Sequence, residues 1–171
     1  MKTLSTLVLF AGLAFGVVVV NVPGPAAADG GTSVGKSTAA KPDDPDYTAA
    51  VTAIKADNFA RAIPLLEGVV ARDGTNADAY NWLAYAIRRS GEPARAIPIY
   101  QKALAIDSKH RGAHEYIGEA YLTLDDLAKA KEHLATLNSL CFFPCSEYRD
   151  LKKAVEAYEK SGGKTKPVAT R

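Results

Sequence analysis

The sequence predicts an all-α protein built from stacked helical hairpins, and two observations support this prediction. Apolar residues recur at intervals of three and four along successive segments, which is the spacing of one face of an α-helix. The segments themselves repeat about every 34 residues, with Ala62, Ala96 and Ala130 at equivalent positions. A single hairpin cannot bury its own apolar face, so we expect its copies to pack on one another.

The middle copy shows the hairpin most clearly. Tyr80, Leu83 and Ile87 fall on one helical face, Gly91 interrupts the pattern, and the periodicity resumes toward Tyr100. A glycine between two periodic segments marks a turn more often than a continuing helix. Residues 77–110 are therefore predicted to form a helix, a tight turn and a second helix.

The period and this pattern of large and small residues resemble the tetratricopeptide repeat. The resemblance implies an α-solenoid of three helix–turn–helix units, at about residues 43–76, 77–110 and 111–144. A closing helix over residues 146–160, with Leu151 and Val155 in its apolar stripe, would then hide the exposed face of the last repeat. On this basis the repeat domain spans residues 46–160.

The first 28 residues have the pattern of a secretion signal. Lys2 provides the positive start, residues 7–20 form an apolar run, and Ala28 ends a cleavage site of small residues. This apolar run is shorter than the roughly 20 residues that cross a bilayer. We therefore expect cleavage after Ala28, a periplasmic or secreted product, and no stable membrane insertion after cleavage.

Two further segments are predicted to lack regular structure: a linker at residues 29–45 and a polar tail at residues 161–171. The linker contains Gly30, Gly35, Lys36 and Ser37 at the spacing of a phosphate-binding loop. That loop works only between a buried strand and a helix, where backbone N–H groups converge on the phosphates. No such strand is predicted here, so we expect no nucleotide cofactor.

Composition and motifs argue against catalysis, nucleic-acid binding and a metal site. A net charge of +2 gives no basic footprint for nucleic acid. No serine, histidine and carboxylate set has the context of a nucleophile. His110 and His114 have the spacing of two metal ligands on one helix face, but the repeat register places His110 in a turn and His114 in a packing position. We expect a non-enzymatic protein without cofactors.

Cys141 and Cys145 are the most specific feature outside the repeats. Pro144 favours an extended residue before it, so the segment is expected to bend and bring the two sulfur atoms together. A structural disulfide suits an oxidising compartment. Two alternatives stay open from the sequence: a thiol-redox or Cu(I)-binding pair, and two free buried thiols.

The resemblance also implies a concave groove, lined by the first helix of each repeat, that receives a peptide. Chaperone-binding members of the family clamp a peptide carboxylate with Lys and Asn, but the first copy here offers Tyr47 and Val51 at those positions. Arg88 and Arg89 remain as a pair that could hold a carboxylate in a fork. The alternative is that the charged residues are only a solvated helix face. The residues expected in the groove are Tyr47, Val51, Ile54, Lys55, Asp78, Asn81, Tyr85, Arg88, Arg89, Glu115, Glu119, Leu122 and Thr123.

These observations predict a protein-interaction scaffold or adaptor in the cell envelope that binds a peptide or protein partner in its groove. A second hypothesis is a thiol-redox or copper-handling protein that uses Cys141 and Cys145. A third is a structural spacer within a larger assembly. The sequence favours the first because a repeat array offers a surface for docking and no deep pocket for turnover.

Overall fold

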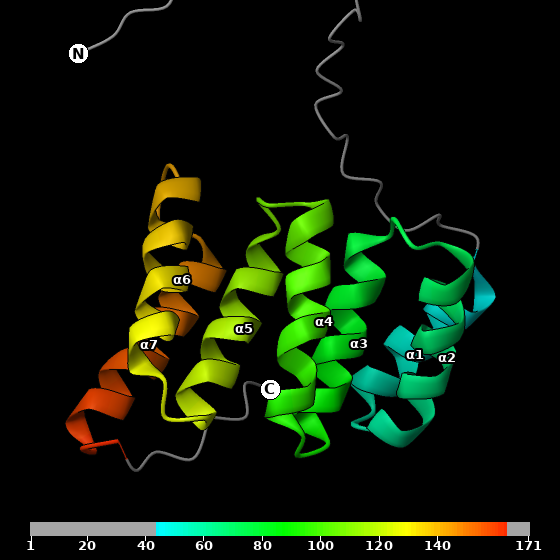
Figure 1. Ribbon diagram of the computed structural model, residues 1–171, viewed down its shortest axis with the longest axis horizontal. Helices are drawn as coiled ribbons and strands as arrows, with labels where there is room; N and C mark the ends of the chain where they lie inside the picture. The colour runs from blue at the N-terminus through cyan, green and yellow to red at the C-terminus, as the bar shows by residue number, and fades with distance from the viewer. Residues whose placement is uncertain (1–43, 164–171) are drawn as a thin grey trace, which may run out of the picture. The chain divides into compact units, whose positions relative to one another are not determined.

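The computed structural model describes residues 44–163, which form seven α-helices and no strand. The expected signal segment at 1–28, the phosphate-loop pattern and the tail residues 164–171 lie outside the described residues. The predicted all-α array of three helical hairpins and a closing helix is confirmed (Figure 1). The helices are α1 (Pro45–Lys55), α2 (Phe59–Arg72), α3 (Ala77–Arg89), α4 (Pro93–Ile106), α5 (Arg111–Thr123), α6 (Leu127–Leu140) and α7 (Ser146–Lys160).

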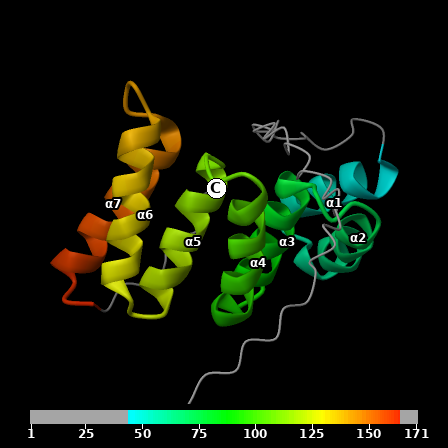
Figure 2. The same cartoon turned by 45° about the horizontal axis from the view of Figure 1, so that its top comes forward.

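The helices follow one another in order from α1 and α2 to α6 and α7 (Figures 1 and 2). Each hairpin packs on the next, because α2 contacts α3 and α4 contacts α5. The backbones of the first helices also approach one another, α1 with α3 and α3 with α5, whereas those of α2, α4 and α6 lie farther apart. Side chains still connect α2 to α4, since Arg95 pairs with Glu67 at 3.4 Å. The first helices therefore form the inner side of the array.

The turn inside each hairpin has the same backbone conformation. Asp57, Gly91 and Asp125 occupy equivalent positions, and each has a positive φ of 53°, 100° and 60°, respectively. The N–H of the following residue closes each turn on a carbonyl of the preceding helix, as Asn58 does on Ala53 at 2.8 Å. This is the usual left-handed ending of a helix, which glycine adopts without strain and aspartate tolerates. The common turn fixes the period of the array.

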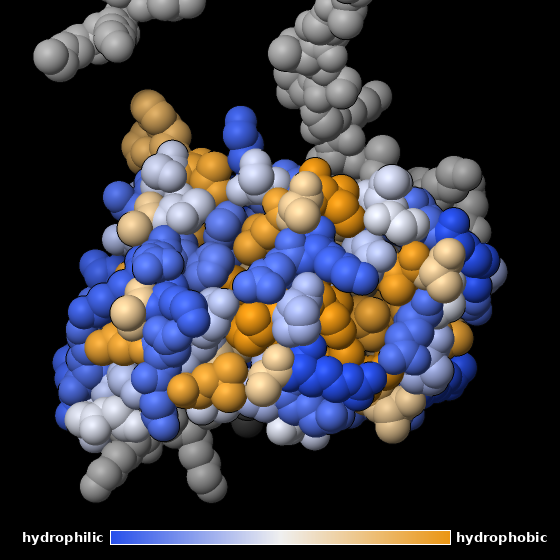
Figure 3. Space-filling model, in the orientation of Figure 1, coloured by the Kyte–Doolittle hydropathy of each residue, from blue (hydrophilic) through white to orange (hydrophobic). Residues whose placement is uncertain are grey.

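Small residues sit where the two helices of each hairpin approach. Ala62, Ala96 and Ala130 are all completely buried, one in each hairpin. They lie beside larger core residues such as Leu66 and Tyr100, which are also fully buried. Figure 3 shows the side of α2 and α4, where apolar side chains gather over the middle of the array and polar ones surround them.

Replacing Ala96 by Leu is expected to lower the free energy of unfolding by about 1–3 kcal/mol, because the larger side chain overpacks the crossing of α3 and α4. Urea denaturation followed by circular dichroism would measure the change. Gln101→Leu is the matched control, since Gln101 is exposed on the same helix, and its effect should stay within about 0.5 kcal/mol. Equal transition midpoints for the two variants would contradict this packing.

The closing helix α7 covers the last hairpin. Its buried residues Leu151, Val155 and Tyr158 pack against α5 and α6. The hydroxyl of Tyr158 donates a hydrogen bond of 3.0 Å to the side chain of Asp125. A disulfide between Cys141 and Cys145, with Cα atoms 5.8 Å apart, ties the end of α6 to the start of α7. The α7 helix thus takes the place of a next repeat.

Candidate functional site

A groove runs along the inner side of the array and has a volume of about 980 Å³. Its walls come from the first helices α1, α3 and α5, and the first turn of α7 closes one end. All three repeats and the closing helix therefore contribute to one surface. The groove is lined by Ile54, Lys55, Asp57, Asp78, Asn81, Trp82, Tyr85, Arg89, His110, Gly112, Glu115, Tyr116, Ser146, Glu147 and Asp150.

The structure places part of the predicted set in this lining. The predicted residues that line the groove are Ile54, Lys55, Asp78, Asn81, Tyr85, Arg89 and Glu115. Three others, Tyr47, Val51 and Thr123, are half-buried and lie outside the lining. The remaining three lie in the interior: Arg88, Glu119 and Leu122 are 8%, 3% and 6% exposed.

The position of Arg88 corrects the expectation that it faces a ligand beside Arg89. Its guanidinium lies 2.9 Å from the carboxylate of Glu119, and both side chains are almost fully buried. The same guanidinium lies 5.4 Å from the ring centre of Tyr85 and 5.7 Å from that of Tyr116. Burial raises the pKa of Glu119, while Arg88 beside it acts in the opposite direction. This buried pair lies beneath the groove, where Arg88 contacts two of the aromatic rings that line it.

Arg89, the next residue in the sequence, does line the groove, and other protein groups already contact its guanidinium. It donates a hydrogen bond of 2.8 Å to the Tyr85 hydroxyl and pairs with Asp57 at 3.2 Å. At the opposite wall, His110 caps α5 by accepting the backbone N–H of Ala113 on Nδ1. That bond leaves the proton on Nε2, which lies 3.1 Å from Asp78. Arg89 and His110 therefore both have carboxylate partners from the groove itself.

Aromatic side chains form the middle of the groove. Trp82 meets Tyr85 edge to face with ring centres 5.6 Å apart, and Tyr85 lies 4.9 Å from Tyr116. Aromatic rings supply contact area at little cost in conformational entropy, which suits a surface that binds peptides. The sequence did not single out Trp82 or Tyr116, although each directly follows a predicted groove residue on its helix.

The end of the groove toward α7 is acidic. Glu115 is only 6% exposed, and Glu147 and Asp150 of α7 line the groove beside it. Burial, together with the nearby carboxylates of Glu119, Asp150 and Glu147, raises the pKa of Glu115 from 4.5 to about 8. Sequence reasoning missed Glu147 and Asp150 as groove residues because α7 has no counterpart in the earlier repeats.

The raised pKa of Glu115 predicts a pH-dependent stability. Between about pH 4.5 and 8 the folded protein binds more protons at this site than the unfolded chain, so the site makes the protein less stable as pH rises. Glu115→Gln removes the ionisable group and is expected to stabilise the protein by about 1–3 kcal/mol near pH 9 and to have little effect near pH 4. Urea denaturation at both pH values would measure this.

Glu156→Gln provides the control, since Glu156 is exposed on the outer side of α7. This variant should show no such difference between the two pH values. If Glu115→Gln stabilised the protein equally at both pH values, this would contradict the raised pKa of Glu115.

Within residues 44–163, no three His, Cys, Asp or Glu side chains lie where they could hold a metal ion. Both cysteines of the chain are engaged in the disulfide. The thiols that the redox or copper hypothesis needs are therefore joined to each other in this structure.

Two sequence models described as "Tetratricopeptide repeat" match residues 47–111 and 88–155, and together they span the helical array. The chain belongs to the tetratricopeptide repeat (TPR) family. It is also 33% identical over 91 residues to "Tetratricopeptide repeat protein 1" of Schizosaccharomyces pombe. That match covers 50% of this chain and 9% of the relative, so the chain spans only a small part of the relative's length.

Solved TPR structures share the fold at low sequence identity. The Yersinia enterocolitica type III secretion translocator chaperone SycD has a TM-score of 0.63 and 17% identity, with 68% of this chain and 83% of SycD covered. SycD in complex with a peptide of the translocator YopD has a TM-score of 0.59, 18% identity and coverages of 68% and 88%. The first TPR domain of the human RPAP3 protein has a TM-score of 0.57, 22% identity and coverages of 68% and 94%.

These findings place the chain among protein-interaction modules, because TPR arrays present docking surfaces for proteins and peptides. Among the helices between Asp44 and Gly163, none is long and apolar enough to cross a membrane.

Proposed function

We propose that this TPR protein is an adaptor that binds an extended or helical segment of a protein partner in the groove. The observation that supports this most is the groove itself, to which all three repeats and α7 contribute side chains. Its aromatic middle offers apolar contact, and its acceptors and cations at the two ends offer polar contacts. Similar TPR folds hold a peptide, as in the complex of SycD with the YopD segment.

We further propose that the adaptor works in the cell envelope after export. The support is the sequence pattern of residues 1–28, a positive start, an apolar run and a small-residue cleavage site. An oxidising compartment also suits the disulfide between Cys141 and Cys145. Cell fractionation and the intact mass of the product test this: an envelope protein that begins at Asp29 is expected, and an unprocessed protein in the cytoplasm would contradict it.

Groove binding is best tested by filling the groove without removing a contact. A side chain at Gly112 of α5 would project beside Asn81 and His110, with its Cβ no closer than 3.5 Å to either. Gly112→Tyr is therefore expected to leave the fold intact and to block the groove. Gly68→Tyr is the matched control, because Gly68 lies within α2, away from the lining, and only the flexible end of Arg72 approaches its Cβ position.

The measurement is quantitative capture of interacting proteins from native envelope extract, with both variants checked by circular dichroism. Partners captured by the unmodified protein should be retained by Gly68→Tyr and lost from Gly112→Tyr by a factor of ten or more, on the order of 1.4 kcal/mol. Equal capture by the two variants would mean that the groove is not the binding surface.

A further inference from the structure

The acidic end of the groove contains carboxylates without a cation. Glu115 of α5 and Asp150 of α7 make no hydrogen bond or ion pair within residues 44–163. Their neighbour Glu147 is reached by Arg111, but at 3.7 Å and from an exposed position. The protein therefore neutralises the charge at this end only in part.

The burial of these acceptors makes their lack of partners informative. Glu115 is 6% exposed, although it lines the groove, and a buried carboxyl group normally has a hydrogen-bond partner. The side-chain oxygen Oδ1 of Asn81, on the neighbouring helix α3, is buried and accepts no hydrogen bond within the described residues. The Glu115 side chain and the buried Asn81 Oδ1, on the neighbouring helices α5 and α3, thus lack a donor, which a bound group could supply.

The surroundings specify what kind of donor fits. The rings of Trp82 and Tyr116 also line the groove, with Tyr116 near Glu115, and aromatic faces attract cations. The groove cation Arg89 is engaged with Asp57 and Tyr85. Carboxylates, an amide oxygen and aromatic faces together match a guanidinium or an ammonium group on an apolar stem. An acidic side chain would be repelled here.

We propose that the end of the groove between α3, α5 and α7 is a subsite for an arginine or lysine side chain of the bound segment. Glu115, with Asp150 beside it, accepts from the cation, Asn81 Oδ1 accepts a further N–H, and Trp82 and Tyr116 contact the stem. This proposal rests on the proposed peptide-binding function. It adds to that function the charge of the partner segment. The partner segment is basic at the position that reaches α7.

The electrostatics of the groove agree with this assignment. Burial and the carboxylates of Glu119, Asp150 and Glu147 raise the pKa of Glu115 to about 8, and Arg88 behind it only partly opposes them. A bound cation favours the ionised form of Glu115 and would displace its proton. Affinity for a permanently charged cation should therefore rise between about pH 6 and 9 and level off above the pKa of Glu115.

A small probe tests the subsite without knowledge of the partner. Butylguanidinium carries the end of an arginine side chain, and butylurea has nearly the same shape without the charge. In a two-dimensional NMR titration of the isotope-labelled protein, butylguanidinium should shift the Trp82 indole and the backbone amides around Glu115 in a saturable way, and butylurea should not. Trp82 is the single tryptophan of the chain, so its indole signal is assigned directly.

Two variants make the result specific. Glu115→Gln should weaken butylguanidinium binding at least about tenfold and abolish the pH dependence of the affinity, whereas Asp57→Asn, at the other end of the groove, should change neither. Equal affinity for butylguanidinium and butylurea, unchanged binding to Glu115→Gln, or shifts confined to residues outside the groove would each overturn the proposal.

The chain's own basic C-terminal segment is a competing occupant. Lys164→Ala combined with Lys166→Ala should bind butylguanidinium with the same affinity as the unmodified protein. Tighter binding by this variant would assign the subsite to the chain's own segment and overturn the assignment to a partner.

Failure of this inference is distinguishable from failure of the proposed function. Loss of partner capture by Gly112→Tyr without butylguanidinium binding would reject the cation subsite alone. Butylguanidinium binding together with full capture by Gly112→Tyr would reject groove binding of the partner alone.

Discussion

Arg88→Met is expected to lower the free energy of unfolding by about 3–5 kcal/mol, because the substitution leaves Glu119 buried without its partner. The ion pair connects α3 to α5, and both of its side chains are less than one-tenth exposed. Methionine fills a similar volume, so the loss reflects the uncompensated carboxylate and not a cavity. Urea denaturation with two spectroscopic probes would measure the change.

The double variant Arg88→Met with Glu119→Met is the decisive control. Removing both charges should recover most of the lost stability, since a buried pair replaced by apolar residues of similar volume is often neutral or stabilising. The coupling between the two substitutions, obtained from a double-mutant cycle, should exceed about 1 kcal/mol. Additive losses would show that the two residues do not depend on each other.

Leu151→Ala is expected to cost about 2–5 kcal/mol, because Leu151 of α7 is fully buried and packs on α5. Its partner is Gly118, where a Cβ would lie only 2.6 Å from Leu151 Cδ2. Thermal unfolding monitored by circular dichroism would show the loss as a lower melting temperature. An unchanged melting temperature would contradict the docking of α7.

The close approach of Gly118 and Leu151 predicts that their substitutions compensate. Gly118→Ala alone should destabilise, since its methyl group would displace the packed Leu151 side chain. In the Leu151→Ala background the same methyl group has room, and alanine favours the helix over glycine by about 1 kcal/mol. The second substitution should therefore raise the melting temperature of the first variant. A further decrease would mean that these two residues do not face each other.

The fold was predictable because each repeat shows the same pattern of helix and turn residues. Alanines at 62, 96 and 130 mark the three hairpins, and the structure buries all of them completely. Gly91 indicated one turn, and Asp57 and Asp125 adopt the same left-handed conformation at equivalent positions. Local helical periodicity and the period of the repeat together determine which elements pack, so the all-α solenoid follows from the sequence.

The groove was less predictable because its lining depends on packing angles that no local pattern encodes. Arg88 and Arg89 are adjacent in the last turn of α3, yet the structure turns Arg88 to Glu119 in the interior and Arg89 to the groove. Glu147 and Asp150 enter the groove only because α7 docks across its end. A helix outside the repeat has no equivalent copy from which its orientation can be inferred.

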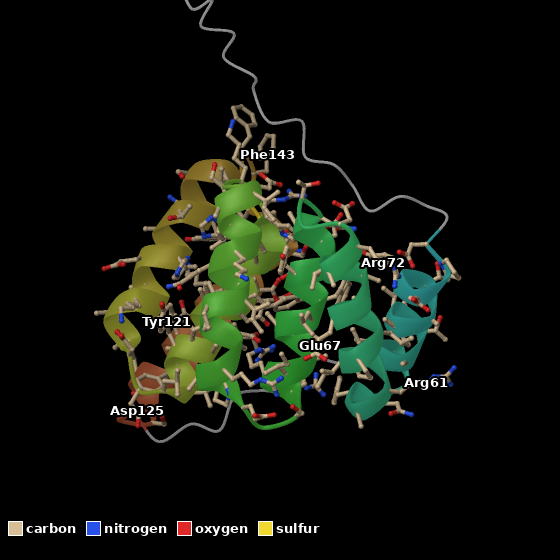
Figure 4. All side chains as sticks on the ribbon, turned by 45° about the vertical axis from the view of Figure 1, so that its right-hand side comes forward. Arg61, Glu67, Arg72, Tyr121, Asp125 and Phe143 are labelled. Carbon is tan, nitrogen blue, oxygen red and sulfur yellow. A yellow bond between two sulfur atoms is a disulfide. The ribbon has the colours of Figure 1, made fainter. Side chains whose placement is uncertain are left out.

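The exposed loop before α7 illustrates a second limit of sequence reasoning. Phe142 and Phe143 lie between the two cysteines and are 95% and 77% exposed, and Figure 4 shows Phe143 projecting away from the helices. Their hydrophobicity alone predicts burial. Among residues 44–163 no helix covers this short disulfide-closed segment, which only the arrangement of α6 and α7 reveals.

Site-specific photo-cross-linking in native cells would show whether the partner lies on the inner side formed by the first helices. A benzophenone amino acid is placed at Lys55, an exposed groove residue of α1, or at Glu67, an exposed residue of α2 outside the groove (Figure 4). If the partner binds in the groove, position 55 should give one partner adduct that Gly112→Tyr abolishes, and position 67 should give no such adduct. Adducts from position 67 alone would contradict groove binding.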